Sequence, residues 1–189
     1  MLLLYGPAVR IREELPNEYA AAANVQREAF GPEAKDAVSY VTDLRASLAS
    51  EPGLSIVAIE DDEVVGHALF TRNLLDAPRQ LVDIQVLSPI GVLPAVQGRG
   101  IGGALVRFGL QELAQRDVPM VVLEGSPDYY ARFGFVPGSR FGLRRPSLRI
   151  PETAFQVKTL PSYESWMTGT VVYRPEFWRH DAVGLRDNQ

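Results

Sequence analysis

The chain has 189 residues, of which 46% are hydrophobic and 22% charged, and its formal net charge is -4. These values are typical of a globular protein with a sizeable core, and the negative charge argues against a nucleic-acid partner. The chain has no cysteine, which excludes disulfides, thiolate metal sites and a cysteine nucleophile, and which fits a cytoplasmic protein. No apolar stretch approaches the length of a membrane-spanning helix, so we expect no membrane partner.

The first half of the chain predicts two helices and an antiparallel sheet. Asn17 is of a residue type that caps helices, and glycine-proline combinations at 31–32 and 52–53 end the two helices. Consecutive strands joined by short polar turns pair antiparallel. In chain order we expect a strand over residues 9–13, helices over 18–29 and 33–49, and strands over 54–59, 64–71 and 81–93.

The pattern changes in the second half. A glycine-rich loop over 97–103 precedes a helix over 104–116, whose polar side chains recur every four residues. An apolar run over 120–123 is too short for a helix and predicts a buried strand, so a β-α-β unit with a parallel pair follows. Farther on we expect a helical turn at 128–133, a loop over 138–151, strands over 154–160 and 169–173, and a helical turn at 175–179. The expected fold class is α/β with a mixed sheet.

Four glycines lie directly before the amphipathic helix: Gly98, Gly100, Gly102 and Gly103. Glycine is required where the backbone approaches a ligand closely or adopts a positive φ. A helix N-terminus offers unpaired N–H groups and partial positive charge, which suit a phosphate group. A tight turn without a ligand is the alternative, but four glycines cost more chain entropy than a turn warrants. The loop therefore predicts a phosphate-binding site.

The glycine spacing admits more than one phosphate ligand. Gly98-x-Gly100-x-x-Gly103 matches the dinucleotide fingerprint, and Glu124 lies about 20 residues farther on, where an acid would bind the ribose. Against a dinucleotide, residues 94–97 separate the strand from the first glycine, the preceding strands are antiparallel, and no further β-α-β series follows. A P-loop is excluded because the sequence has no Gly-Lys-Ser/Thr.

A second pattern in the same loop, Gln97-x-x-Gly100-x-Gly102, resembles the Gln/Arg-x-x-Gly-x-Gly/Ala signature of the GNAT acetyltransferase superfamily. The resemblance implies a GNAT-like acyl-CoA N-acyltransferase fold. In that fold a central, mostly antiparallel sheet has one parallel, splayed strand pair and flanking helices. The resemblance also implies one GNAT domain over residues 1–189, with its core over 9–136 and a C-terminal extension over 137–189.

By this resemblance the chain takes acetyl-CoA as its acyl donor and uses no metal. Backbone groups of Val92 and Leu93 are expected to pair with the pantetheine arm, and the loop is expected to hold the pyrophosphate. For Arg99, a solvated side chain is the alternative. The implied donor-binding residues are Val92, Leu93, Gln97, Gly98, Arg99, Gly100, Ile101, Gly102 and Gly103.

The segment 129–135, Tyr-Tyr-Ala-Arg-Phe-Gly-Phe, resembles the family's Tyr-x-x-x-Gly-Phe motif, with Tyr130 as its tyrosine. The resemblance makes Tyr130 the general acid for the coenzyme A sulfur, since a phenol with an ordinary pKa of about 10 is protonated at neutral pH. Packing at a strand-helix junction is the alternative. Glu124 is the candidate general base, with a solvated strand-end acid as its alternative. Many relatives have an asparagine where this chain has Leu123, which leaves side-chain contacts to the pantetheine open.

The histidines and an arginine-rich loop are two further candidates for function. His67 lies in an alternating strand and predicts a hydrogen-bonded structural histidine, and two distant histidines form no metal site. In the GNAT fold, residues 30–32 would lie near the acceptor. Four arginines would either reach an acidic acceptor or lie in a solvated loop: Arg140, Arg144, Arg145 and Arg149.

The expected reaction is transfer of an acetyl group to a primary amine of a small molecule or a peptide, by direct attack in a ternary complex. Two other functions stay open. One is a catalytically silent acyl-CoA sensor or binding module, and the other is an NAD-binding, Rossmann-like protein. A homodimer is also left open.

Overall fold

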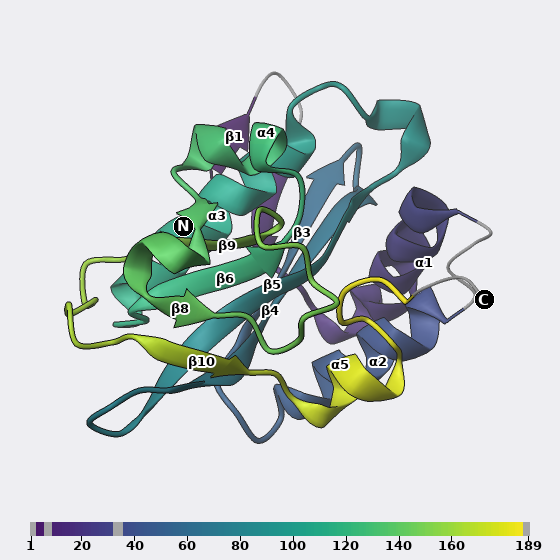
Figure 1. The fold of residues 1–189 in the computed structure, drawn as a ribbon. Coiled ribbons are helices and arrows are strands. Elements are labelled where there is room, and N and C mark those ends of the chain that lie inside the picture. Colours follow the sequence, from purple (N-terminus) through teal and green to yellow (C-terminus); the bar gives the residue numbers. More distant parts are fainter. Residues whose placement is uncertain (1–2, 6–8, 32–35, 187–189) are drawn as a thin grey trace. The chain divides into compact units, whose positions relative to one another are not determined.

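The computed structural model describes residues 3–5, 9–31 and 36–186 (Figure 1). The chain divides into two compact units, one made of Met1–Thr71 and Leu87–Glu112, the other of Arg72–Val86 and Leu113–Gln189. Strands β4 (Glu63–Asp76) and β5 (Leu81–Val92) contribute residues to both units. Within the described ranges, no helix has the length and apolar character needed to cross a membrane. The expectation of a single domain stays a prediction.

The first unit contains an antiparallel sheet in which strands β1 to β4 pair in chain order. In the pairing of β3 with β4, Ser55 lies opposite Leu69 and Val57 lies opposite His67. Besides parts of β4 and β5, the elements are β1 (Leu3–Tyr5), β2 (Val9–Glu13), the 3-10 turn η1 (Pro16–Glu18), α1 (Tyr19–Phe30), α2 (Ala37–Ser47), β3 (Leu54–Glu60), the 3-10 turn η2 (Pro94–Val96) and most of α3 (Ile101–Gln115).

Helices cover both faces of this sheet. Neighbouring residues of a strand point to opposite faces, so Gly66 and His67 of β4 show which helix packs on each face. A Cβ atom on Gly66 would lie 3.1 Å from Leu105 Cδ1 and 3.2 Å from Ile101 Cγ2, so α3 packs directly on β4. The next residue, His67, meets Gln26 of α1 on the other face. An apolar cluster fills the space between α1 and the sheet: Ala22, Val25, Val57, Ile59 and Val64.

The second unit is built around β6 (Met120–Glu124). This strand runs parallel to β5, with Gln85 opposite Val121, and antiparallel to β9 (Phe155–Thr159). The other pairings are β9 with β7 (Val136–Pro137), β10 (Gly169–Val172) with the end of β4, and β10 with β8 (Leu143–Arg144). The helical segments are α4 (Pro127–Tyr130), η3 (Ala131–Phe133), η4 (Gly138–Phe141) and α5 (Pro175–Arg179).

The mixed sheet with flanking helices confirms the predicted fold class, and a parallel strand pair of β5 and β6 is present. The splaying of that pair stays a prediction. The predicted cap by Asn17 is wrong: Glu18 precedes α1, and its carboxylate accepts a hydrogen bond from the Leu15 N–H, which holds residues 16–18 in a 3-10 turn. The expected start of the second helix at 33 lies outside the described residues.

Two other boundaries differ from the sequence prediction. Strand β4 extends to Asp76 because its end pairs with β10, a partner about a hundred residues later that local patterns cannot indicate. The predicted loop over 138–151 contains η4 and the short strand β8, which pairs with β10 in parallel. The longer β4 and the strand β8 therefore both come from pairing with β10.

His67 is completely buried, and both of its ring nitrogens are hydrogen-bonded. The Gln26 amide nitrogen donates to the His67 carbonyl oxygen and lies 2.9 Å from Nδ1, so Nδ1 accepts and the proton resides on Nε2. Nε2 then donates to Ser55 Oγ at 3.0 Å, and Ser55 Oγ donates to Glu14 at 2.6 Å. These contacts confirm the predicted structural role of this histidine.

Burial, with a smaller contribution from the positive charge of Arg45, lowers the pKa of His67 from 6.5 to about 3. The neutral ring is therefore the folded-state form at physiological pH. In the unfolded chain His67 regains its ordinary pKa, so between these two values the unfolded chain binds one more proton than the folded protein.

This difference predicts that stability rises with pH in that window and is lost as the pH falls from about 6.5 toward 3. The contribution of one proton is about 1.4 kcal/mol per pH unit. In urea unfolding at a series of pH values, His67→Gln should show a shallower acid loss of stability than the unmodified protein. His180→Gln, a control at a side chain that is not buried, should keep the original slope. Parallel pH profiles for His67→Gln and the unmodified protein would contradict the assignment.

Candidate functional site

The chain turns sharply between the end of β5 and the start of α3, and glycine backbone conformations make the turn. Gly98 and Gly100 have φ angles of +76° and +83°, which lie in the left-handed region. Gln97 just before them is extended, and its side-chain amide donates a hydrogen bond of 3.0 Å to the Val92 carbonyl oxygen. This bond ties the loop back to the end of β5.

The space around the two left-handed glycines is open on the side where other residues carry a side chain. No described atom lies within 4 Å of the position that a Cβ would take on Gly98 or on Gly100. The first helical hydrogen bond of α3 runs from the Ala104 N–H to the Gly100 carbonyl oxygen. The N–H groups of the residues just before Ala104 therefore have no intrahelical acceptor. Open space beside such donors fits a phosphate group.

Helix α3 begins at Ile101, three residues before the predicted start at 104. Gly102 and Gly103 therefore belong to the first turn of the helix rather than to the loop. Glycine is unfavourable mainly in a helix interior, so its presence in the first turn does not prevent helix formation. The consequence is that Ile101, Gly102 and Gly103 present backbone N–H groups from a helix N-terminus, where a negatively charged group is stabilised.

Arg99 is held by an ion pair within the first unit. Its guanidinium contacts both carboxylate oxygens of Glu60, at 2.9 and 2.5 Å, and this bidentate contact raises the pKa of Arg99. The Arg99 side chain is about half exposed, which limits the strength of the pair. Sequence reasoning did not identify Glu60, because the pair joins residues that are 39 positions apart.

The backbone of Leu93 already has partners within the first unit. Its N–H donates to the Val65 carbonyl oxygen at 2.9 Å, and its carbonyl oxygen accepts from the Val96 N–H at 3.0 Å. The Val92 carbonyl oxygen accepts from Gln97, as described above. A carbonyl oxygen has a second lone pair, so both carbonyl groups retain capacity for a further donor. The single Leu93 N–H, in contrast, already donates its hydrogen bond to Val65 of β4.

In the second unit Tyr130 ends α4, directly before the η3 turn and the left-handed Gly134. Its ring lies against the chain just after β6: a Cβ on Gly125 would come within 2.4 Å of the Tyr130 ring. Tyr129 and Phe135 meet the same ring edge-to-face, with centroid distances of 4.9 and 5.8 Å. Gly125 is thus needed for the position of Tyr130, a requirement that the sequence motif does not express.

Burial, with a smaller contribution from the neighbouring Tyr129, raises the pKa of Tyr130 to about 12. The phenol is therefore protonated throughout the neutral range and can donate a proton. The packing contacts and a proton-donating role are compatible, because the aromatic neighbours hold the ring while the hydroxyl group lies at its end.

Glu124 is the last residue of β6, and its carboxylate accepts a hydrogen bond of 2.9 Å from the Gly184 N–H. Burial raises the pKa of Glu124, and the hydrogen bond from Gly184 and the charge of Arg149 partly oppose the shift. A raised carboxyl pKa moves toward the range that suits a general base at neutral pH. The sequence pattern did not predict Gly184 as a partner of Glu124, because the two residues lie 60 positions apart.

Three of the four arginines of the loop have partners in the second unit. Arg144 donates to Thr170 Oγ1, Arg149 forms an ion pair of 3.1 Å with Asp181, and Arg145 lies 4.0 Å from Glu152. These contacts favour structural roles for the three arginines over binding of an acidic acceptor. Among the side chains that the structure describes, no group of three or more acidic, histidine or cysteine residues could hold a metal ion.

The sequence of this chain is similar to known acetyltransferases. A family model described as an acetyltransferase (GNAT) domain matches residues 10–138. The uncharacterized N-acetyltransferase YhbS of Escherichia coli strain K12 is 31% identical over 176 residues, covering 89% of this chain and 98% of YhbS. A second uncharacterized N-acetyltransferase of that strain, YjhQ, is 36% identical over 117 residues, covering 60% of this chain and 61% of YjhQ. The match to YjhQ thus spans less than two thirds of that protein.

Solved structures agree with these sequence relationships. The crystal structure of Escherichia coli YhbS in complex with CoA superposes with a TM-score of 0.79 at 28% identity, covering 94% of this chain and 96% of YhbS. A GNAT family acetyltransferase from Brucella melitensis in complex with acetyl-CoA has a TM-score of 0.70 at 34% identity, covering 89% of this chain and 97% of that chain. Family model, relatives and fold agree, and the chain belongs to the GNAT superfamily of N-acetyltransferases.

Proposed function

We propose that this protein transfers an acetyl group from acetyl-CoA to a primary amine. The observation that carries the proposal is the turn between β5 and α3, where two left-handed glycines leave open space beside the N-terminal N–H groups of a helix. Such a turn suits the pyrophosphate of coenzyme A. The proposed donor-binding set is the predicted one: Val92, Leu93, Gln97, Gly98, Arg99, Gly100, Ile101, Gly102 and Gly103.

Two related proteins support the choice of donor. The YhbS structure contains CoA and the Brucella melitensis structure contains acetyl-CoA, and both relatives match nearly the whole of this chain. Membership of the GNAT superfamily disfavours the dinucleotide interpretation of the glycine spacing. Val92 and Leu93 are proposed to pair with the pantetheine arm, and Leu93 should do so through its carbonyl oxygen, because its N–H donates to Val65.

In the proposed reaction the neutral amine nitrogen attacks the thioester carbonyl carbon, and the carbon–sulfur bond breaks. The Tyr130 phenol donates its proton to the departing thiolate, and the amine nitrogen loses a proton to solvent or to Glu124. The tyrosinate then regains a proton from solvent. The chain has no cysteine, so transfer through an enzyme thioester is excluded, which supports the proposed direct attack in a ternary complex.

The acceptor is proposed only as a class, a small-molecule amine or a peptide amine. A catalytically silent acyl-CoA sensor is the other function consistent with the turn, because binding alone requires no acid. The cytoplasmic location expected from the composition stays a prediction.

Gly100→Ala is predicted to weaken acetyl-CoA binding at least about tenfold, because a Cβ in the left-handed region strains the turn and projects into the open space. Gly31→Ala is a control outside the glycine turn, since Gly31 also has a positive φ, of +71°, with no described atom within 4 Å of its Cβ position. Both variants should lose roughly 1 to 3 kcal/mol of stability, because a side chain is strained in either backbone conformation. Calorimetric titration should separate them: equal affinities for acetyl-CoA would argue against the turn as the binding site.

Tyr130→Phe tests the proton donor. The substitution removes the hydroxyl group and keeps the ring that Tyr129 and Phe135 contact. We expect acetyl-CoA affinity to stay the same and kcat to fall by about tenfold or more, because the thiolate loses its acid. Steady-state kinetics with any accepted amine measure both quantities. An unchanged kcat would remove Tyr130 from the mechanism.

A panel of amines distinguishes the enzyme from a silent sensor. Small primary amines, amino acids and short peptides are each incubated with the protein and acetyl-CoA, and free thiol is measured over time. The proposal predicts amine-dependent thiol release with at least one acceptor class. Saturable acetyl-CoA binding without amine-dependent release across the panel would favour the sensor.

A further inference from the structure

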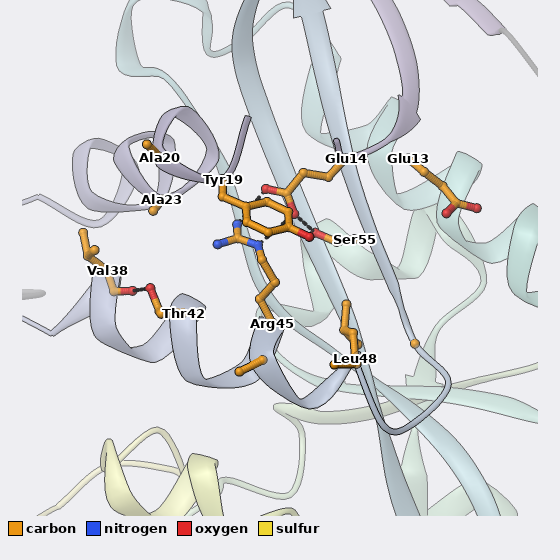
Figure 2. Close-up of a pocket in the computed structure, with 13 residues that line it drawn as sticks. Glu13, Glu14, Tyr19, Ala20, Ala23, Val38, Thr42, Arg45, Leu48 and Ser55 are labelled. Carbon is orange, nitrogen blue, oxygen red and sulfur yellow. Dashed lines mark hydrogen bonds and ion pairs between the residues drawn. The ribbon is translucent and has the colours of Figure 1, made fainter. Parts of the chain in front are cut away.

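A cavity of about 710 Å³ lies in the first unit, between α1 and α2 and beside the start of β3 (Figure 2). Its volume falls within the range of pockets that bind small molecules. None of the residues that line it belongs to the glycine turn. The lining residues are Glu13, Glu14, Tyr19, Ala20, Ala23, Val38, Thr42, Arg45, Ala46, Leu48, Ala49, Gly53 and Ser55.

Arg45 is the central polar group of this cavity. Its side chain is only 8% exposed, and Nε and Nη2 bond the two carboxylate oxygens of Glu14 at 2.9 and 2.7 Å. The Tyr19 ring stacks on the guanidinium, with its centroid 4.5 Å from Cζ. A planar guanidinium bound in this way on one edge and one face has a fixed orientation. Arg45 is therefore a preorganised hydrogen-bond donor.

One guanidinium nitrogen, Nη1, remains for a ligand. Within the part of the chain that the structure describes, Arg45 has no interaction that would occupy Nη1. In Figure 2 the side of the guanidinium away from Glu14 is turned toward Ala23 and Thr42, two residues that line the cavity. A buried guanidinium N–H that faces a cavity gains stability when a ligand oxygen accepts its hydrogen bond.

The charge of Arg45 is already balanced. The Glu14 side chain is 1% exposed, and Ser55 Oγ donates a further hydrogen bond to its carboxylate. An anionic ligand would be attracted by Arg45, but Glu14 would repel it and offset much of that attraction, and Glu13 adds another negative charge to the cavity wall. The electrostatics therefore disfavour an anion and favour a neutral oxygen acceptor.

The remaining walls are mainly aliphatic. Ala20 and Ala23 come from α1, and Val38, Ala46 and Ala49 come from α2 and the turn after it. Short side chains on both helices leave room for an apolar part of a ligand, whose burial would contribute binding energy.

We propose that this cavity, named here the α1–α2 pocket after the lining residues above, binds a neutral small molecule that combines a carbonyl group with a short aliphatic chain. The carbonyl oxygen accepts a hydrogen bond from Arg45 Nη1, and the chain lies along the alanines of α1 and α2. The inference does not rest on acetyl transfer, since it uses none of the residues assigned to the donor or to the chemistry.

Three probes with six carbon atoms each and different polar groups test the chemistry: hexanamide, hexanoate and hexylamine. Each is titrated into the 189-residue protein and followed by amide chemical-shift changes in a heteronuclear NMR spectrum. Hexanamide should shift resonances of α1 and α2 and bind at least about tenfold more tightly than hexanoate, since the anion meets Glu14. Tighter binding of hexanoate or hexylamine, or no saturable shift with hexanamide, would overturn the proposal.

Two neighbouring alanines on α1 give a matched pair of variants. Ala20 and Ala21 are both exposed, but only Ala20 lines the pocket. Ala20→Phe should fill the pocket and reduce hexanamide affinity at least about tenfold, whereas Ala21→Phe should leave it unchanged. Equal effects of the two substitutions on hexanamide binding would contradict the assigned site.

The role of Arg45 requires a double substitution, because removing Arg45 alone would leave Glu14 buried without a partner. Glu14→Gln with Arg45→Met removes both charges and keeps the aliphatic walls. The double variant should retain its fold by circular dichroism and lose the preference for hexanamide over hexanoate. A folded double variant that keeps the preference would contradict the role of Arg45, and if the variant fails to fold, the Ala20→Phe and Ala21→Phe pair decides the proposal.

Discussion

The turn from β5 into α3 depends on a backbone conformation that glycine alone adopts without strain. Gly98 and Gly100 both occupy the left-handed region, and between them the chain leaves the strand and enters the helix within a few residues. A Cβ at either position would strain the backbone and project into the space beside the helix N-terminus. The same geometry thus sets the direction of α3 and keeps its first N–H groups accessible.

The helices of the first unit are held close to the sheet by small residues at their contacts. A Cβ on Gly91 would lie 2.7 Å from Gln26 Oε1 and 2.9 Å from Ala29 Cβ, so α1 rests directly on β5 one residue before Val92. On the opposite face a Cβ on Gly109 of α3 would lie within 2.3 Å of the Phe70 ring. Close packing at these points fixes the strand end from which the loop starts.

A chain of buried polar contacts runs through the same unit. It starts at Arg45 and passes through Glu14, Ser55 and His67 to Gln26, with every hydrogen bond between 2.6 and 3.0 Å. The ion pair and the neutral histidine are linked through Ser55 and support each other, while Gln26 Oε1 is buried without a hydrogen-bond partner among the described residues. One end of this chain opens into the α1–α2 pocket, and the other end meets α1 where it rests on β5.

Local sequence patterns predicted the strand, loop and helix around the glycine turn, because glycine spacing and helical periodicity act over short distances. The pattern did not indicate that α3 would start at Ile101, since Gly102 and Gly103 were counted with the loop. Contacts between distant residues were also missed: Arg99 with Glu60, Glu124 with the Gly184 N–H, and Glu14 with Arg45. These pairs form only when the sheet and helices bring their residues together.

The most direct test of the central claim is calorimetric titration of the unmodified protein with acetyl-CoA and, separately, with NAD. If the turn holds the pyrophosphate of the acyl donor, acetyl-CoA should bind saturably with one site per chain, and NAD should give no saturable heat. Saturable binding of NAD without binding of acetyl-CoA would contradict the account and restore the dinucleotide interpretation of the same glycines.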